Sequence, residues 1–285
     1  MYNVYMQVRI MKKWLFGIFN LAALAGLLLA APLPAMAAPA HQALPPAGQS
    51  ADPGRAQAFI QLVNNWTAPD QPAENNQDLP QANPDLVIYL TFDDGPDPDW
   101  TPQILALLQK YHATAVFYEI GRNARTYPQI SLQVAEAGQM IGLHSYNHIE
   151  LTKLGYNDFY LEVIDTRDAI LDALSSRPDL EDHLTPCLRP PYGAVNDSVY
   201  NRAYDLNYAI SMWHLDTRDW TGISGEEILA IVERELEPYR VVLMHDGGED
   251  RSETVRGLGL VLHELTLRGY HFEPYCTATG QEYNH

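Results

Sequence analysis

Two adjacent carboxylates stand where an apolar run gives way to a turn. Asp93 and Asp94 come shortly after the run at residues 86–90 and precede Gly and Pro at residues 95–96. A β-branched and aromatic run stopped by such a dipeptide is typical of a buried strand that ends at a loop. Neighbouring side chains on an extended segment point in opposite directions. We therefore expect one aspartate to bind a metal and the other to transfer protons. An isolated Asp-Asp-Gly-Pro is more often a solvated turn, so the rest of the chain must decide.

Two histidines follow another apolar segment at a spacing that suits a metal. His144 and His148 are four residues apart, so a helical turn would put both rings on one face. A pair of surface histidines has the same spacing, and the pair alone does not decide between the two interpretations. Together with one aspartate, the histidines make a set of two imidazoles and one carboxylate. Such a set leaves coordination positions open for water and substrate, as a catalytic metal site requires.

An arginine and two prolines follow a later apolar segment. Arg189 begins the sequence Arg-Pro-Pro-Tyr-Gly at residues 189–193. Arginine can hold a carboxylate through two charge-assisted hydrogen bonds and lower the pKa of that carboxylate. The prolines fix the loop, so the main-chain N–H of Tyr192 can point at a developing oxyanion. Such a peptide usually forms a rigid surface turn, and the segment alone does not exclude that outcome.

Two more polar segments complete the set. The segment at residues 216–220 carries Asp219 and Trp220, and His245 closes an apolar run at residues 241–244. A histidine at the end of an apolar strand is often a core residue whose nitrogens are hydrogen-bonded. It is also a suitable general acid, because imidazole titrates near neutral pH.

The elements that must position these groups alternate between strand and helix. Predicted strands cover residues 86–91, 115–118, 140–143, 187–189, 209–213, 241–244 and 270–275. Helical patterns lie between them, and one begins at a capping-box match at residues 224–227. Seven strands that alternate with helices predict a parallel sheet, either open or closed into a barrel. All five polar groups fall at the carboxyl ends of predicted strands, and in a β/α barrel those ends share the face that carries catalysis.

Taken together, the five segments resemble the motifs of the polysaccharide deacetylases of carbohydrate esterase family 4, which share the NodB-type homology domain. They occur in the family's order at residues 91–96, 144–148, 189–192, 216–220 and 243–245. The resemblance covers residues 85–276 and implies an α/β fold, a distorted (β/α) barrel of about seven parallel strands in a single catalytic domain.

The resemblance also implies a role for each site residue. Asp94, His144 and His148 would bind a divalent metal, zinc ahead of cobalt or another transition metal. Asp93 would be the catalytic base and His245 the catalytic acid. Arg189 would orient Asp93, and Asp219 would partner His245. The main-chain N–H of Tyr192 would stabilise the oxyanion. Three side chains would contact the substrate: Tyr192, Trp220 and Leu243.

The implied function is hydrolytic removal of N-acetyl groups from an N-acetylglucosamine-containing polysaccharide, peptidoglycan or a chitin-like polymer. An O-acetyl xylan esterase or a non-catalytic sugar-binding protein on the same fold are alternatives. Non-haem iron oxygenases also use two histidines and a carboxylate, but the strand–helix alternation disfavours them. Two departures from the family pattern, Glu119 and the segment at residues 138–143, leave the substrate preference open.

Domain organisation follows from the resemblance and from composition. We place the catalytic domain at residues 85–278 and a short tail at residues 279–285. Residues 38–84 are rich in Ala, Pro, Gln and Asn, which is typical of a linker, and residues 56–66 within it have the spacing of a short helix.

The first 37 residues are predicted to be a signal peptide. Lys12 and Lys13 precede an apolar run at residues 14–31, and Ala-Met-Ala at residues 35–37 is a small-x-small cleavage site; Met11 is an alternative start. An uncleaved membrane anchor is the other interpretation, but prolines follow the run at once and a spanning helix needs about 20 apolar residues. Under either interpretation we expect a secreted or cell-envelope protein.

The net charge limits the classes of molecule that can be partners, and the cysteine content limits the disulfides that can form. The net charge of −18 argues against nucleic acid and anionic membranes. We therefore expect a polysaccharide or oligosaccharide partner and infer no protein partner. Cys187 and Cys276 are the only cysteines, and export permits a disulfide between them. A bridge requires Cα atoms within about 7 Å, which the sequence does not establish.

Overall fold

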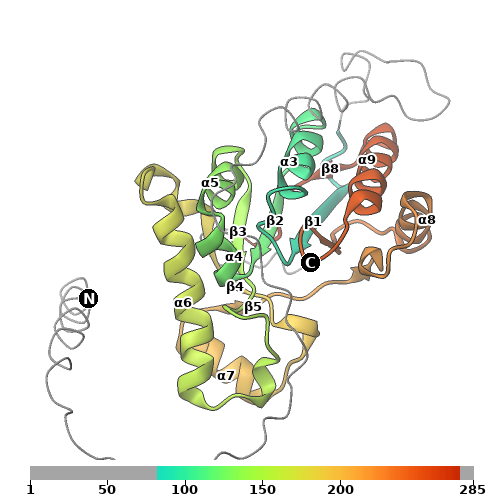
Figure 1. The fold of residues 1–285 in the computed structure, drawn as a ribbon. Helices are drawn as coiled ribbons and strands as arrows, with labels where there is room; N and C mark the ends of the chain where they lie inside the picture. Colours follow the sequence, from blue (N-terminus) through green and yellow to red (C-terminus); the bar gives the residue numbers. More distant parts are fainter. Residues whose placement is uncertain (1–81, 277–285) are drawn as a thin grey trace, which may run out of the picture. The chain divides into compact units, whose positions relative to one another are not determined.

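The structure, a computed structural model, describes residues 82–276 (Figure 1). The predicted signal peptide, nearly all of the predicted linker with its short helix, and the predicted tail lie outside these residues. Within them, parallel strands form one curled sheet and helices pack against it. This arrangement confirms the predicted distorted (β/α) barrel.

Eight strands make up the sheet in the described range. They are β1 (Val87–Asp93), β2 (Ala115–Glu119), β3 (Met140–Leu143), β4 (Leu184–Leu188), β5 (Ala209–Ile210), β6 (Leu215–Asp216), β7 (Arg240–His245) and β8 (His271–Phe272). Seven of them lie in the order β5-β4-β3-β2-β1-β7-β6, and β8 pairs with the beginning of β1. Every pair is parallel. Because β5 and β6 stand at opposite ends of this order, the described sheet is curled but not closed.

Some strands differ from the prediction at their ends. β1 continues through Asp93 instead of stopping at residue 91. The strand predicted at residues 209–213 is only two residues long, and just after it the carbonyl of Ser211 accepts a hydrogen bond from the Arg189 side chain. β6 was not predicted, since two residues are too few for an alternating pattern.

Seven α-helices connect the strands in the described range. They are α3 (Thr101–Lys110), α4 (Gly121–Thr126), α5 (Pro128–Glu136), α6 (Tyr156–Leu174), α7 (Asp197–Asp205), α8 (Gly225–Glu235) and α9 (Ser252–Leu267). The predicted capping box begins α8: Ser224 Oγ accepts the Glu227 N–H at 3.3 Å, and Glu227 Oε2 accepts the Ser224 N–H at 2.9 Å. Between residues 82 and 276, no helix is both long enough and apolar enough to cross a membrane.

β1 is a central strand, and all seven of its side chains are buried. A strand covered on both faces reads as a continuous apolar run, as this one does. One face joins the large core that the helices share, through Ile88, Leu90 and Phe92. The other face carries Tyr89 and, by alternation, Asp93. Burial of one side chain as large as Phe92 stabilises the fold by about 1.5–3 kcal/mol, so the apolar residues determine which way Asp93 points.

A disulfide joins β4 to the segment that follows β8. Cys187 and Cys276 have Cα atoms 6.5 Å apart, within the range that bridging requires. Both side chains are buried in a small cluster with Val116 and Tyr118. The sequence left open whether Cys187 and Cys276 are bonded, and the structure shows that they are. The bond ties the C-terminal segment to the strand that leads directly into Arg189.

We expect loss of this bridge to lower thermal stability. The cysteines are 89 residues apart, and in the chain-entropy account a cross-link of that span is worth about 4–5 kcal/mol. Cys276→Ser should therefore lower the Tm in calorimetry. A reductant should lower the Tm of the unmodified protein but leave that of the variant unchanged. Two free thiols in the denatured, unreduced wild-type chain would contradict the bridge.

Candidate metal and catalytic site

The carboxyl ends of neighbouring strands bring the predicted site residues together. β1 lies between β2 and β7, and Asp93 is in register with Tyr118 on one side and His245 on the other. His144 directly follows β3 and Arg189 directly follows β4. Groups that are far apart in the chain therefore meet at one end of the sheet, as the positions of the motifs predict.

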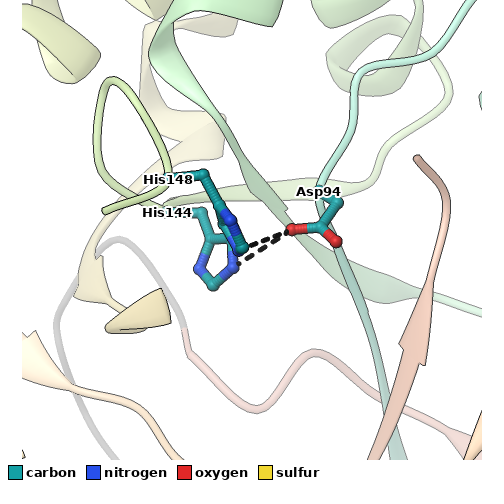
Figure 2. Close-up of side chains that lie close together, drawn as sticks. All are labelled: Asp94, His144 and His148. Carbon is teal, nitrogen blue, oxygen red and sulfur yellow. Dashed lines mark ion pairs between the residues drawn. The ribbon is translucent and has the colours of Figure 1, made fainter. Parts of the chain in front are cut away.

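Asp94, His144 and His148 converge on one point (Figure 2). Asp94 Oδ1 lies 3.1 Å from Nε2 of His148 and 3.4 Å from Nε2 of His144. The two imidazole rings are tilted against each other, with centroids 5.1 Å apart. Among the described residues these three side chains alone bring three metal-ligating groups within 4.8 Å of one another. The structure thus assembles the predicted set of two imidazoles and one carboxylate.

The histidines do not share a helical turn, and this part of the interpretation is wrong. Residues 144–148 have no regular secondary structure. The main chain turns back through two residues with left-handed φ angles, 61° at Ser145 and 56° at His148. The loop brings both rings to Asp94 by a different route from the one that the spacing predicts.

The two aspartates do not face opposite sides either. Asp94 has a φ of 76°, so the chain is no longer extended there and strand alternation does not apply. As a result both carboxylates approach His144: Asp93 Oδ2 is 3.8 Å from Nε2, and Asp94 Oδ1 is 3.4 Å from it. The aspartates differ in their other partners, since Asp94 meets His148 and Asp93 meets Arg189.

The charges and tautomers of the three side chains fit a divalent metal. His144 Nδ1 lies 2.8 Å from the carbonyl of Arg189, which can only accept, so Nδ1 carries a proton and Nε2 is the nitrogen available to a metal. Burial alone would lower the pKa of His144, but the carboxylates of Asp93 and Asp94 outweigh it and raise that pKa. Burial would likewise raise the pKa of Asp94, yet the imidazoles hold it well below its usual range. The site therefore favours a positive charge among donors that zinc and similar ions prefer.

A fully buried arginine holds Asp93. Arg189 Nη1 donates to Asp93 Oδ1 and to Thr91 Oγ1, both at 2.8 Å. The guanidinium carbon lies 4.0 Å from the centroid of the Tyr118 ring, within the range of a cation–π contact. This pairing confirms the predicted contact between Arg189 and Asp93. It leaves Oδ2 of Asp93 directed at Nε2 of His144, 3.8 Å away.

His245 is held by Asp219 at the end of β7. Asp219 Oδ1 accepts the Nδ1–H of His245 at 2.9 Å, and Oδ2 accepts the main-chain N–H of His245 at 2.8 Å. Oδ2 also accepts the hydroxyl of Thr254 on α9 at 2.9 Å. Burial would lower the pKa of His245, but the contact with Asp219 outweighs it and raises that pKa. With the proton on Nδ1 anchored, Nε2 is the nitrogen that can exchange a proton with substrate.

The three residues predicted to contact substrate differ in exposure and in their neighbours. Tyr192 is 70% exposed and packs edge-on against His148, with ring centroids 4.8 Å apart. Leu243 is buried in β7 and shares a face with His245, two residues later. Trp220 is 53% exposed and follows Asp219 directly in a short 3-10 helix.

A groove of about 560 Å³ runs beside the metal site. Its lining residues are His148, Ile149, Glu150, Lys153, Leu154 and Tyr192. Four of them lie at residues 149–154, just after the segment that carries His144 and His148. Nothing in their residue types or spacing in the sequence predicted a surface beside the site.

Glu119 does not line the site. Its side chain is fully buried and accepts a hydrogen bond from Ser131 on α5 at 2.6 Å. Burial raises the pKa of Glu119 to about 8. This departure from the family pattern is therefore a buried residue whose side chain bonds to α5 and not to the site residues.

Some contacts of the site were not foreseen. Asn123 on α4 donates its side-chain amide to the carbonyl of Asp94 at 2.9 Å. Tyr118 supports Arg189 and Thr254 supports Asp219. These residues lie in ordinary strand or helix patterns, so the sequence carried no signal for their contacts.

Comparison with known proteins agrees with this geometry. A sequence model described as polysaccharide deacetylase matches residues 81–211. A peptidoglycan-N-acetylglucosamine deacetylase of Bacillus cereus is 36% identical over 192 residues, which cover 67% of this chain and 86% of that protein. A chitooligosaccharide deacetylase of Sinorhizobium fredii is 29% identical over 193 residues, which cover 64% of this chain and 87% of that protein.

A solved structure is similar as well. The peptidoglycan deacetylase PdaC from Bacillus subtilis has a TM-score of 0.59 at 30% identity, over 67% of this chain and 88% of the solved chain. The full PdaC protein is a peptidoglycan-N-acetylmuramic acid deacetylase, and this chain spans 37% of its length at 34% identity. With the motifs, the site geometry and these similarities in agreement, the chain belongs to the polysaccharide deacetylase family, carbohydrate esterase family 4.

Proposed function

We propose that the protein hydrolyses N-acetyl groups on the N-acetylglucosamine units of a polysaccharide, with peptidoglycan as the first candidate substrate. The observation that carries this proposal is the convergence of three groups at one end of the sheet: the set of Asp94, His144 and His148, the carboxylate of Asp93, and the imidazole of His245. Hydrolysis of an amide needs a polarised carbonyl, a base for water and an acid for the leaving amine.

Asp94, His144 and His148 would hold the metal, and zinc is the first candidate because of the donor types. A divalent ion bound there supplies Lewis-acid chemistry, since it makes water more acidic and polarises a carbonyl group. Asp93 is the base: Arg189 occupies one of its oxygens, and the other takes a proton from the water that attacks the acetamide carbon.

Collapse of the tetrahedral intermediate needs a proton at nitrogen. His245 provides it from Nε2, while Asp219 stabilises the imidazolium through Nδ1. The main-chain N–H of Tyr192 would donate to the oxyanion, as the resemblance implies, and Tyr192 lies beside His148 with ring centroids 4.8 Å apart. The carbon–nitrogen bond breaks, and the products are acetate and a glucosamine unit. Trp220 and Leu243 would contact the acetyl methyl.

The identity of the polymer rests on the relatives and on the predicted export signal. The similar proteins are named for peptidoglycan and for chitooligosaccharides, which both contain N-acetylglucosamine. An exported enzyme would meet peptidoglycan in the cell envelope or outside it. The predicted signal peptide therefore favours peptidoglycan and a secreted or envelope location.

The alternatives predict different products. An O-acetyl xylan esterase would release acetate from xylan, and a non-catalytic sugar-binding protein would release none. Every residue that the resemblance assigns to metal binding, base and acid is present in this chain, which favours a catalyst over a binding protein.

We expect acetate release from N-acetylglucosamine polymers to require a metal. Incubation with peptidoglycan, chitin oligomers and acetylated xylan, followed by mass spectrometry, should show loss of acetyl from the first two. A chelator should abolish the activity, and zinc or cobalt should restore it. Release from xylan alone would favour the esterase. Full activity of a protein shown to be metal-free by elemental analysis would contradict the proposal.

Substitution of Asp94 and substitution of Asp93 should have different effects on metal binding and turnover. Asp94→Asn should weaken metal binding, because a neutral amide is a poorer ligand than a carboxylate. Asp93→Asn should retain the metal but lower turnover by about 10²–10⁴-fold, the usual contribution of a general base. Metal content and turnover are measured together, with the exposed Asp250→Asn as control. The roles are reversed if Asp93→Asn empties the site while Asp94→Asn keeps the metal.

The alkaline limb of the pH–rate profile should depend on Asp219. His245 must be protonated to act as the acid, and its contact with Asp219 raises its pKa, which keeps it protonated to higher pH. Asp219→Asn removes the negative charge, so the pKa of His245 falls and the alkaline limb of kcat/KM should move to lower pH. Asp250→Asn should leave both limbs in place. A limb that stays put or moves to higher pH in Asp219→Asn would rule out His245 as the titrating acid.

A further inference from the structure

The loop that carries both histidines is held in an unfavourable main-chain conformation. We call residues 144–148 the histidine loop. Two of its five residues, Ser145 and His148, have left-handed φ angles, which are unfavourable for residues other than glycine. Such a conformation persists only where the surrounding structure enforces it. The contacts that enforce it therefore also determine where the two rings lie.

One buried carboxylate makes three hydrogen bonds to the histidine loop. Glu162 on α6 is 7% exposed. Its Oε2 accepts the main-chain N–H groups of Tyr146 and Asn147, each at 2.8 Å, and its Oε1 accepts the side-chain amide of Asn147 at 2.6 Å. Within residues 82–276 no lysine or arginine forms an ion pair with this carboxylate. A buried carboxylate is costly unless it is hydrogen-bonded, so the histidine loop is what satisfies Glu162.

The histidine loop is held from the other side by the beginning of α4. The N–H of Gly121 donates to the carbonyl of Ser145 at 3.0 Å, and the N–H of Arg122 donates to the carbonyl of Tyr146 at 3.1 Å. The packing is tight, since a Cβ on Gly121 would lie 2.5 Å from the Tyr146 ring. The α4 amides bond the loop carbonyls, and Glu162 bonds the loop N–H groups. Together they leave the turn little freedom.

We propose that Glu162 is a positioning residue for the metal site, whose carboxylate holds the histidine loop so that His144 and His148 converge on Asp94. The inference rests on the proposed function, in which these three side chains bind a divalent metal. Glu162 touches neither substrate nor metal in this account. It acts through the main chain between the two histidine ligands.

The test measures metal affinity rather than activity. Zn²⁺ is titrated into metal-free protein in competition with a chromophoric chelator, and the Tm of the metal-free protein is recorded beside it. Glu162→Gln keeps the size of the side chain but replaces the charged acceptor. We expect it to weaken Zn²⁺ binding about 10- to 100-fold, the range found when groups that orient metal ligands are lost.

Glu253→Gln is the matched control. Glu253 on α9 also accepts a main-chain N–H from another element, that of Gly225 at 2.7 Å, but it does not contact the histidine loop. A residue with a merely structural role lowers the Tm and leaves the Zn²⁺ affinity of the folded protein unchanged, and we expect that result for Glu253→Gln. Asn147→Ala removes one of the three bonds and should weaken Zn²⁺ binding less than Glu162→Gln does.

The outcomes separate this inference from the proposed function. A wild-type protein that binds no Zn²⁺ contradicts the proposed metal site itself. If the wild type binds Zn²⁺ and Glu162→Gln binds it equally well, the positioning role is overturned while the metal site stands. Should Glu162→Gln fail to fold, Asn147→Ala carries the test, and an affinity within about twofold of wild type overturns the inference.

Discussion

The buried side chain of Arg189 connects the two halves of the site. Its guanidinium binds Asp93, the proposed base, while its main-chain carbonyl accepts the Nδ1–H of His144, a proposed metal ligand. One residue therefore sets the orientation of the base and the tautomer of the ligand. A buried cation without a partner is strongly destabilising, so the fold depends on the pairing of Arg189 with Asp93 as much as the chemistry does. The Tyr118 ring beneath the guanidinium fits only because Gly142 has no side chain, since a Cβ there would lie 2.5 Å from the ring.

The parallel sheet makes this connection possible. β1 ends at Asp93 between the ends of β2 and β7, and β3 and β4 deliver His144 and Arg189 beside it. The apolar residues of β1 determine its register, and a slip of one residue would turn Asp93 to the helix-covered face. The disulfide at Cys187 adds a covalent tie two residues before Arg189. Stability and catalysis thus depend on the same strands.

The residues of the site were predictable from the sequence, whereas much of its local geometry was not. Polar groups at the ends of apolar runs indicated the strands, and strand ends in an α/β fold meet on one face, which explains why Asp93, His144 and His245 were found. The prediction that Asp93 and Asp94 point in opposite directions was wrong because Asp94 is not in the extended conformation. The helical turn expected at His144 and His148 was wrong for a similar reason. Left-handed φ angles at non-glycine residues arise from tertiary contacts, such as those of Glu162, which local patterns do not reveal.

The proposed mechanism depends most directly on which side chains hold the metal. Crystals grown with Zn²⁺ and measured at the zinc absorption edge would locate the ion by anomalous scattering. The account predicts one strong peak at about 2.0–2.2 Å from an Asp94 oxygen and from Nε2 of His144 and of His148, with Asp93 outside bonding distance. A peak bonded to Asp93 in place of Asp94, or no peak among these residues at saturating Zn²⁺, would contradict it.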